Sequence, residues 1–160
     1  MYYFTPNYKV AEYYAAYAKR RAHCEAVVVI QLTVPNSAIE GLDAPSLQKY
    51  YWPTDEWKEL IWSSRRVGLP PKHLHTEQAK LIIGHIARDP NKKYKDMSSK
   101  GDITESCLLK AGPQEQQVAV QFVFPRGRNG SEFLSELAVD NLEVYPFTKK
   151  EFRRCPEDRV

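Results

Sequence analysis

Cysteine is scarce and scattered in this sequence. Its 160 residues contain three cysteines, Cys24, Cys107 and Cys155. An odd number at wide spacing excludes a disulfide framework, and the absence of a Cys-x-x-Cys pair excludes a zinc finger. Reduced thiols fit a cytoplasmic protein, and we expect no metal site.

Long apolar runs and sorting signals are also missing. The longest apolar run, from Ala26 to Ile30, is far shorter than the roughly 20 residues that a membrane-spanning helix needs. Residues 1–25 are polar and rich in tyrosine, without the apolar stretch of a secretory signal. The sequence therefore predicts no membrane partner and a cytoplasmic location.

The sequence has no strong excess of either charge. It carries 23 Lys and Arg against 20 Asp and Glu, for a net charge of +3 at pH 7. This balance argues against a dedicated nucleic-acid-binding protein, so we expect no specific nucleic-acid partner. The short basic groups at 19–21, 92–95 and 149–154 are open to two interpretations: solvated helix ends and loops, or a surface that attracts an anionic partner.

Common catalytic motifs are missing as well. The chain has no Gly-x-Ser-x-Gly nucleophile turn, no phosphate-binding loop and no Gly-x-Gly-x-x-Gly dinucleotide turn. The remaining composition, with 42% hydrophobic and 27% charged residues, is that of a folded protein of one-domain size. We expect a single domain over residues 1–147 and a polar C-terminal tail over residues 148–160.

Strand patterns outnumber helix patterns along the chain. β-Branched and aromatic runs predict strands at 2–5, 26–34, 79–87, 117–124 and 142–147, with the second and third of them buried. Apolar spacing and N-cap residues (Asn7, Thr54 or Asp55, Asp102 and Ser131) predict helices at 8–22, 54–67, 102–110 and 131–137. Segment 36–53 is predicted to be a long connection with room for one helical turn, and segment 88–101 an exposed loop or partly mobile insertion. Because the order is not a regular βαβ alternation, the sequence favours an α+β fold with a mainly antiparallel core.

The opening of the chain resembles part of a known family. Tyr3, Phe4 and Thr5, followed by Ala11 and Tyr14, are similar to the strand, turn and helix of the nicotinamide pocket in ADP-ribosyltransferases of the diphtheria-toxin and poly(ADP-ribose) polymerase type. In that family two tyrosines hold the nicotinamide ring of NAD between them. The resemblance implies that Tyr3 and Tyr14 bind this ring, that Thr5 adds a hydroxyl contact, and that NAD or a nicotinamide-like molecule is the ligand.

Three further segments follow in the order of a little-characterised microbial branch of ADP-ribosyltransferase-like domains. Residues 57–62 with Arg65 resemble a helix of that branch, residues 81–89 its strand with a central glycine, and residues 120–124 its late strand. The resemblance extends over residues 2–137. It implies an ADP-ribosyltransferase-like α+β fold with a mainly antiparallel, split β core and short helices.

Gln121 stands where active members of the family carry their catalytic glutamate. That glutamate binds the 2′-hydroxyl of the nicotinamide ribose and stabilises positive charge at the anomeric carbon, whereas a neutral amide can only orient the hydroxyl. Loss of one preorganised electrostatic contact commonly lowers a rate by about 10²–10³-fold. The family's first core strand, with its ribose-binding His or Arg, would precede Tyr3, as if the chain were a fragment.

These departures imply weak or absent ADP-ribosyl transfer or NAD hydrolysis. The alternative is a non-catalytic module on the same scaffold that binds a protein partner or a nucleotide.

Simpler interpretations of the same residues stay open. Tyr3 and Tyr14 could be packing aromatics among ten tyrosines, and Gln121 could be a surface residue on a half-buried strand. His85, beside Gly84, could be a general base, but a hydrogen-bonded histidine at a strand end is the commoner case.

Overall fold

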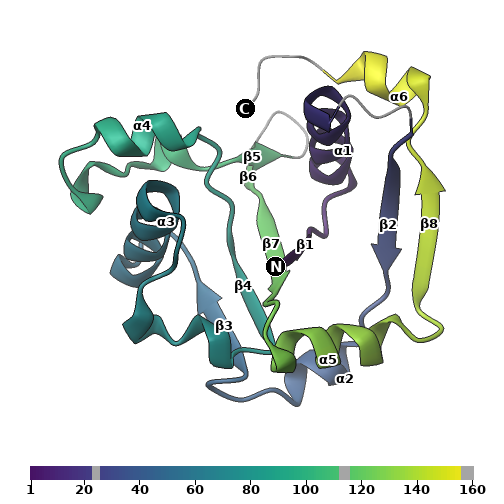
Figure 1. The fold of residues 1–160 in the computed structure, drawn as a ribbon, viewed down its shortest axis with the longest axis horizontal. Coiled ribbons are helices and arrows are strands. Elements are labelled where there is room, and N and C mark those ends of the chain that lie inside the picture. The colour runs from purple at the N-terminus through teal and green to yellow at the C-terminus, as the bar shows by residue number, and fades with distance from the viewer. Residues whose placement is uncertain (23–25, 112–115, 156–160) are drawn as a thin grey trace.

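A four-stranded sheet forms the centre of the structure (Figure 1). The computed structural model describes residues 1–22, 26–111 and 116–155. The strands follow the order β1, β7, β4, β3; β7 is antiparallel to both of its neighbours, whereas β3 and β4 run parallel. Their bounds are Tyr2–Phe4 for β1, Leu47–Tyr50 for β3, Leu81–His85 for β4 and Val120–Phe124 for β7.

Two further strand pairs are antiparallel. β2 (Val28–Leu32) and β8 (Leu142–Pro146) form a separate two-stranded ribbon, and β5 (Lys110–Ala111) pairs with β6 (Gln117–Val118). In this coarse form the predicted α+β class is confirmed: the fold is mixed, its helices are short and its sheets are mostly antiparallel. Among the described helices none combines the length and the apolar character needed to cross a bilayer.

One face of the central sheet packs against α3 (Asp55–Val67) and α4 (Asn91–Asp96). Trp57 of α3 is 1% exposed, and its Nε1 donates a hydrogen bond to the carbonyl oxygen of His85 at 3.0 Å. Burial of apolar area around Trp57 is the main force that holds α3 on the sheet, and the indole hydrogen bond fixes its orientation.

The opposite face of the sheet is covered by α5 (Arg128–Ala138) and α2 (Asn36–Glu40). Phe124 of β7 packs on Phe133 of α5, with ring centroids 6.1 Å apart, and Phe4 of β1 meets Phe124 edge to face. The sheet is therefore buried on both faces, which explains why β4 reads as a continuous apolar run rather than an alternating one.

The ribbon of β2 and β8 packs against α1 (Tyr8–Ala22), where Ala15 and Ala16 meet Val29. The predicted buried strand at 26–34 is wrong in one respect, because Val28 and Ile30 are 48% and 46% exposed. β2 pairs only with β8 among the described strands, so a single face of the ribbon is covered. An apolar run is also compatible with a strand whose second face is open.

Segment 148–160, predicted as a polar tail, contains α6 (Lys149–Arg154). A capping box starts this helix: the Thr148 hydroxyl accepts from the Glu151 N–H at 3.2 Å, and the Glu151 carboxylate accepts from the Thr148 N–H at 2.6 Å. Phe152 packs beside Ala15 and Ala16 of α1. Residues 156–160 lie outside the described residues.

Several predicted segments differ from the observed ones. Segment 36–53 holds α2 and β3, and segment 88–101 holds α4, whose Tyr94 is fully buried, so neither is plain loop. In place of an α-helix at 102–110 there are short 3₁₀ turns, Lys100–Asp102 and Glu105–Cys107, and Asp102 closes a capping box with Ser99 instead of starting a helix. α5 begins at Arg128, before the predicted cap Ser131, because Gly127 takes the N-cap position.

The N-cap prediction for α3 is confirmed. The Thr54 hydroxyl accepts from the Trp57 N–H at 3.3 Å, and Asp55 and Glu56 lie in the first turn, where carboxylates suit the helix dipole. Gly68 ends α3 with a φ of 84°, a left-handed conformation that a residue with a side chain adopts only with strain.

Candidate functional site

Tyr3 and Tyr14 lie on the elements expected of them, a short strand and the helix that follows. Tyr3 in β1 is opposite Val123 of β7 in the antiparallel register. The side chains of Tyr3 and Tyr14 are 62% and 41% exposed, so neither is a core aromatic. Their rings are accessible to a ligand.

The two phenols share one electrostatic neighbourhood with Arg65, in the last turn of α3. Burial around each oxygen raises the pKa of Tyr3 and of Tyr14, although much of each side chain is accessible; Arg65 partly offsets both shifts, and Tyr3 itself adds to the rise at Tyr14. The Arg65 charge therefore acts on both phenol oxygens, which places the three side chains in one region. Both phenols are neutral at pH 7.

Gln121 lies on the same side of the sheet as Tyr3. Val123 faces Tyr3 across the β1–β7 pair, and Gln121 is two residues away on β7, so its side chain points to the same face. The residue is half-buried and stands opposite Gly84 of β4. Its amide makes no hydrogen bond to another described residue, which leaves a donor and an acceptor for a ligand.

Thr5 lies elsewhere. It follows the last residue of β1, its hydroxyl accepts from the Asn7 N–H at 3.3 Å, and it lines a cavity on the opposite face of the sheet. The structure therefore places Tyr3 and Gln121 on one face of the sheet and Thr5 beside the other. A hydroxyl contact from Thr5 to nicotinamide stays a prediction.

Arg65, whose helix resembles a segment of the family, lies in the same region as the two tyrosines. Its Nη2 donates to the carbonyl oxygen of Ala87 at 2.7 Å, its Nη1 donates to Oδ1 of Asn91 at 3.2 Å, and the guanidinium lies over the Tyr94 ring. These contacts hold a cation in a fixed position beside the two tyrosines. A cation in the last turn of a helix is an ordinary dipole partner, so helix patterns alone do not indicate these contacts.

His85 supports the fold. Its Nδ1 accepts from the main-chain N–H of Trp52 at 3.1 Å, and the ring meets Tyr51 edge to face. Burial lowers the pKa of His85, so the ring is neutral at pH 7 with its proton on Nε2. The hydrogen-bonded interpretation of this histidine agrees with the structure.

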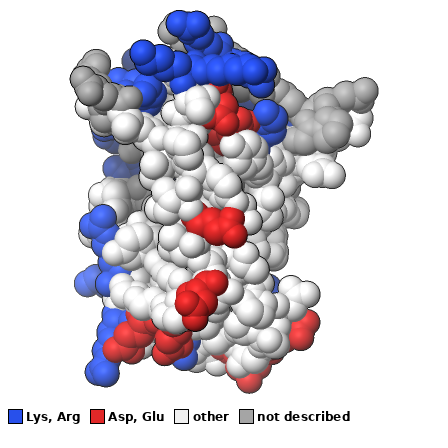
Figure 2. Space-filling view, turned by 90° about the vertical axis from the view of Figure 1, so that its right-hand side faces the viewer, with Lys and Arg blue, Asp and Glu red and all other residues white. Residues whose placement is uncertain are grey.

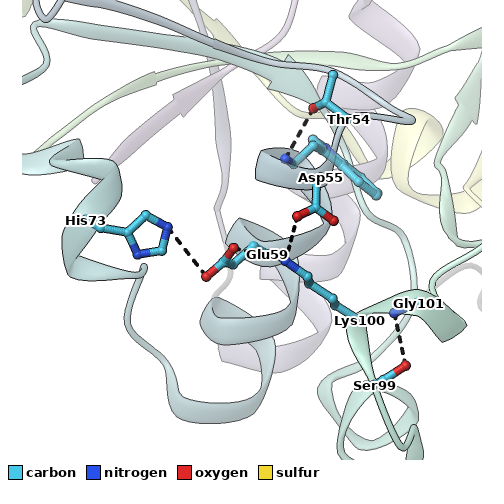
Figure 3. A network of polar contacts seen from close by, with 8 residues as sticks. Thr54, Asp55, Glu59, His73, Ser99, Lys100 and Gly101 are labelled. Atoms are coloured by element: carbon cyan, nitrogen blue, oxygen red, sulfur yellow. Dashed lines mark hydrogen bonds and ion pairs between the residues drawn. The ribbon is translucent and has the colours of Figure 1, made fainter.

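A second polar cluster connects α3 to the turn at 100–102 (Figure 3). Lys100 Nζ lies 2.7 Å from a carboxylate oxygen of Asp55 and 3.1 Å from one of Glu59, and Glu59 also meets His73 at 3.5 Å. Asp55 is 73% exposed at its side chain, and none of these residues lines the cavity that contains Thr5. This network fastens a loop to a helix and does not enclose a substrate.

The cavity that Thr5 lines has a volume of about 390 Å³. It lies between the α5-covered face of the sheet, the start of α1 and the ribbon strand β2. Its walls are mainly apolar, and its lining residues include Phe4, Leu32, Leu81, Phe122 and Phe124.

Among the residues that the structure describes, no group of three or more His, Cys, Asp or Glu could hold a metal ion. Comparisons of the chain with family models, with curated proteins and with solved structures found no match.

Proposed function

We propose that this chain is an ADP-ribosyltransferase-like domain, with a split β core, that binds NAD or nicotinamide between Tyr3 and Tyr14 and transfers ADP-ribose weakly or not at all. The observation that carries the proposal is the accessible pair of phenol rings beside Arg65. The nicotinamide of oxidised NAD is a flat cation, and neutral phenol rings offer electron-rich faces to it.

Arg65 adds an anion partner to this arrangement. The guanidinium has five N–H groups, and two hydrogen bonds, to Ala87 and Asn91, hold it in place. Its remaining donors and its charge suit the diphosphate of NAD.

Gln121 decides the expected activity. Its amide can hold a ribose hydroxyl, but it carries no negative charge to stabilise an oxocarbenium-like centre, so cleavage of the nicotinamide bond is slow. The same observation favours the second candidate, a non-catalytic module that binds a nucleotide or a protein on this scaffold. The free thiols of Cys107 and Cys155 suit a cytoplasmic setting for either one.

Calorimetric titration with nicotinamide and with NAD tests the proposal. We expect saturable binding to the full chain and its loss in Tyr14→Ala. Tyr17→Ala, which removes another α1 tyrosine, is the matched control and keeps binding. Absence of heat at millimolar ligand, or equal loss in both variants, would contradict the proposal.

A further inference from the structure

The hydrogen bonds between β2 and β8 show which edge of each strand is occupied. The Phe147 N–H donates to the carbonyl oxygen of Val27, and the Thr33 N–H donates to that of Asn141, both at 2.9 Å. In an antiparallel pair, residues alternate between those that bond to the partner strand and those that point away from it. These two bonds therefore show that the main-chain N–H and C=O groups of the odd-numbered residues of β2 point toward β8.

The N–H and C=O groups of Val28, Ile30 and Leu32 consequently point away from β8. Among the described strands β2 pairs with β8 alone, so this edge is unpaired. An edge of this kind is a template for one more strand, and it lacks the proline or inward-pointing charge that commonly blocks such edges.

The cavity of about 390 Å³ runs along the same edge. Residues 29–32 line it in an unbroken row. Because successive side chains of a strand point to opposite faces, a hollow that touches four consecutive residues reaches the strand's edge. Tyr145 of β8, the register partner of Val29, also lines it, so the hollow extends from this edge over the Val29 face of the ribbon. Phe122, Phe124 and Leu81 give the hollow apolar walls that suit aliphatic side chains.

The two ends of β2 differ in charge. α6 follows β8 at the end where Val28 lies, and its last turn carries Arg153 and Arg154. Arg20 from the basic last turn of α1 lies over Phe152 of α6, 5.4 Å from the ring centroid, so the two basic segments meet. Figure 2, which faces the ribbon side, shows Lys and Arg gathered at the upper end of this face and along its left margin, and Asp and Glu spaced over its middle and lower part.

We propose that the free edge of β2 binds an extended peptide segment of a partner protein. The peptide adds a third strand to the ribbon through the main-chain groups of Val28, Ile30 and Leu32, and places an aliphatic side chain in the cavity. Acidic residues at one end of the peptide meet the cations of α6 and α1. The apolar hollow, the unpaired edge and the basic end together define this chemistry, and the site is on the opposite side of the sheet from Tyr3 and Gln121.

The test uses a fluorescent peptide of alternating valine and threonine that carries two glutamates at one end, with anisotropy as the readout of binding to the full chain. Ile30→Pro removes an N–H that points to the peptide and leaves the bonds to β8 intact. The matched control is Val144→Pro, which removes an outward N–H from the far edge of the ribbon. We expect Ile30→Pro to weaken binding about tenfold, in line with the loss of one strand hydrogen bond, and Val144→Pro to leave it unchanged.

Two further measurements test the proposal even if Ile30→Pro is poorly folded. Amide hydrogen exchange on the unaltered chain should slow at Val28, Ile30 and Leu32 when the peptide is added, and replacing the peptide's glutamates by lysines should weaken binding. Absence of binding at about 1 mM peptide would overturn the proposal. So would sedimentation showing that a second copy of the chain occupies this edge, or protection confined to another strand.

Discussion

The carbonyl oxygen of Tyr50 occupies the space that a side chain at Gly84 would need. A Cβ at this position would stand closer than 3.0 Å to that oxygen, a separation that real Cβ atoms do not adopt. Tyr50 of β3 and Gly84 of β4 are register partners in the parallel pair, so the glycine allows the two backbones to pack at this point. Gln121 is the partner of Gly84 on its other side.

Gly84→Ala should therefore destabilise the protein by about 1–3 kcal/mol or more, because the backbone of β3 must shift. The free energy of unfolding in urea measures this cost. Gly127→Ala is the comparison variant, since a Cβ there would meet Glu77 at an ordinary 3.5 Å and its cost is limited to a poorer N-cap for α5. Equal stability of Gly84→Ala and the unaltered protein would contradict the close strand packing.

His85 should make stability depend on pH. Burial lowers the pKa of His85 below its ordinary value of 6.5 in the folded state, so on acidification the unfolded chain takes up the proton first. The stability due to neutral His85 is thus complete above pH 6.5 and is lost as pH falls from there through the lowered folded pKa. His85→Asn keeps an acceptor for the Trp52 N–H without titrating in this range, so its unfolding free energy should fall less between pH 7 and pH 5, by urea denaturation. Parallel pH profiles for the two proteins would refute the assignment.

Lys100 should contribute little despite its two short ion pairs. Asp55 is largely exposed and Lys100 is partly so, and exposed ion pairs of this kind contribute little to stability. Lys100→Met should therefore leave the urea midpoint of unfolding almost unchanged, with a still smaller difference in concentrated NaCl. A clear loss of stability that salt does not reduce would mean that the network in Figure 3 has a larger role than the surface geometry indicates.

Gln121→Glu restores a negative charge at the position of the family's catalytic residue. If the domain binds NAD as proposed, the variant should release nicotinamide about 10²–10³-fold faster than the unaltered chain, measured chromatographically. Gln117→Glu adds the same charge at an exposed position of β6 and should have no effect. Unchanged release in Gln121→Glu would show that more than one group is missing, and would favour the non-catalytic module.

Sequence patterns predicted the helices and strands that depend on residues close together in the chain. The Thr54 cap and Gly68 define α3, and the aromatic run from Tyr2 defines β1, because each depends on residues within one turn or one strand. β3 was missed because Gln48 and Lys49 interrupt its apolar pattern, and its pairing with β4 joins segments far apart in the sequence.

α4 was missed for a similar reason. Its sequence is polar, and its one buried side chain, Tyr94, is covered by contacts that include Arg65 from α3. In the candidate site, too, one part could be predicted from local sequence and another part depends on tertiary packing. The spacing of Tyr3 and Tyr14 pointed to a strand and a helix, whereas the place of Arg65 beside them depends on how α3 packs, which no local pattern encodes.

A crystal structure of the chain with nicotinamide bound is the decisive experiment. We expect the ring to lie between the phenols of Tyr3 and Tyr14, with the amide of Gln121 facing the same space. Nicotinamide bound at another place, or a crystal saturated with the ligand in which the two rings enclose nothing, would contradict it.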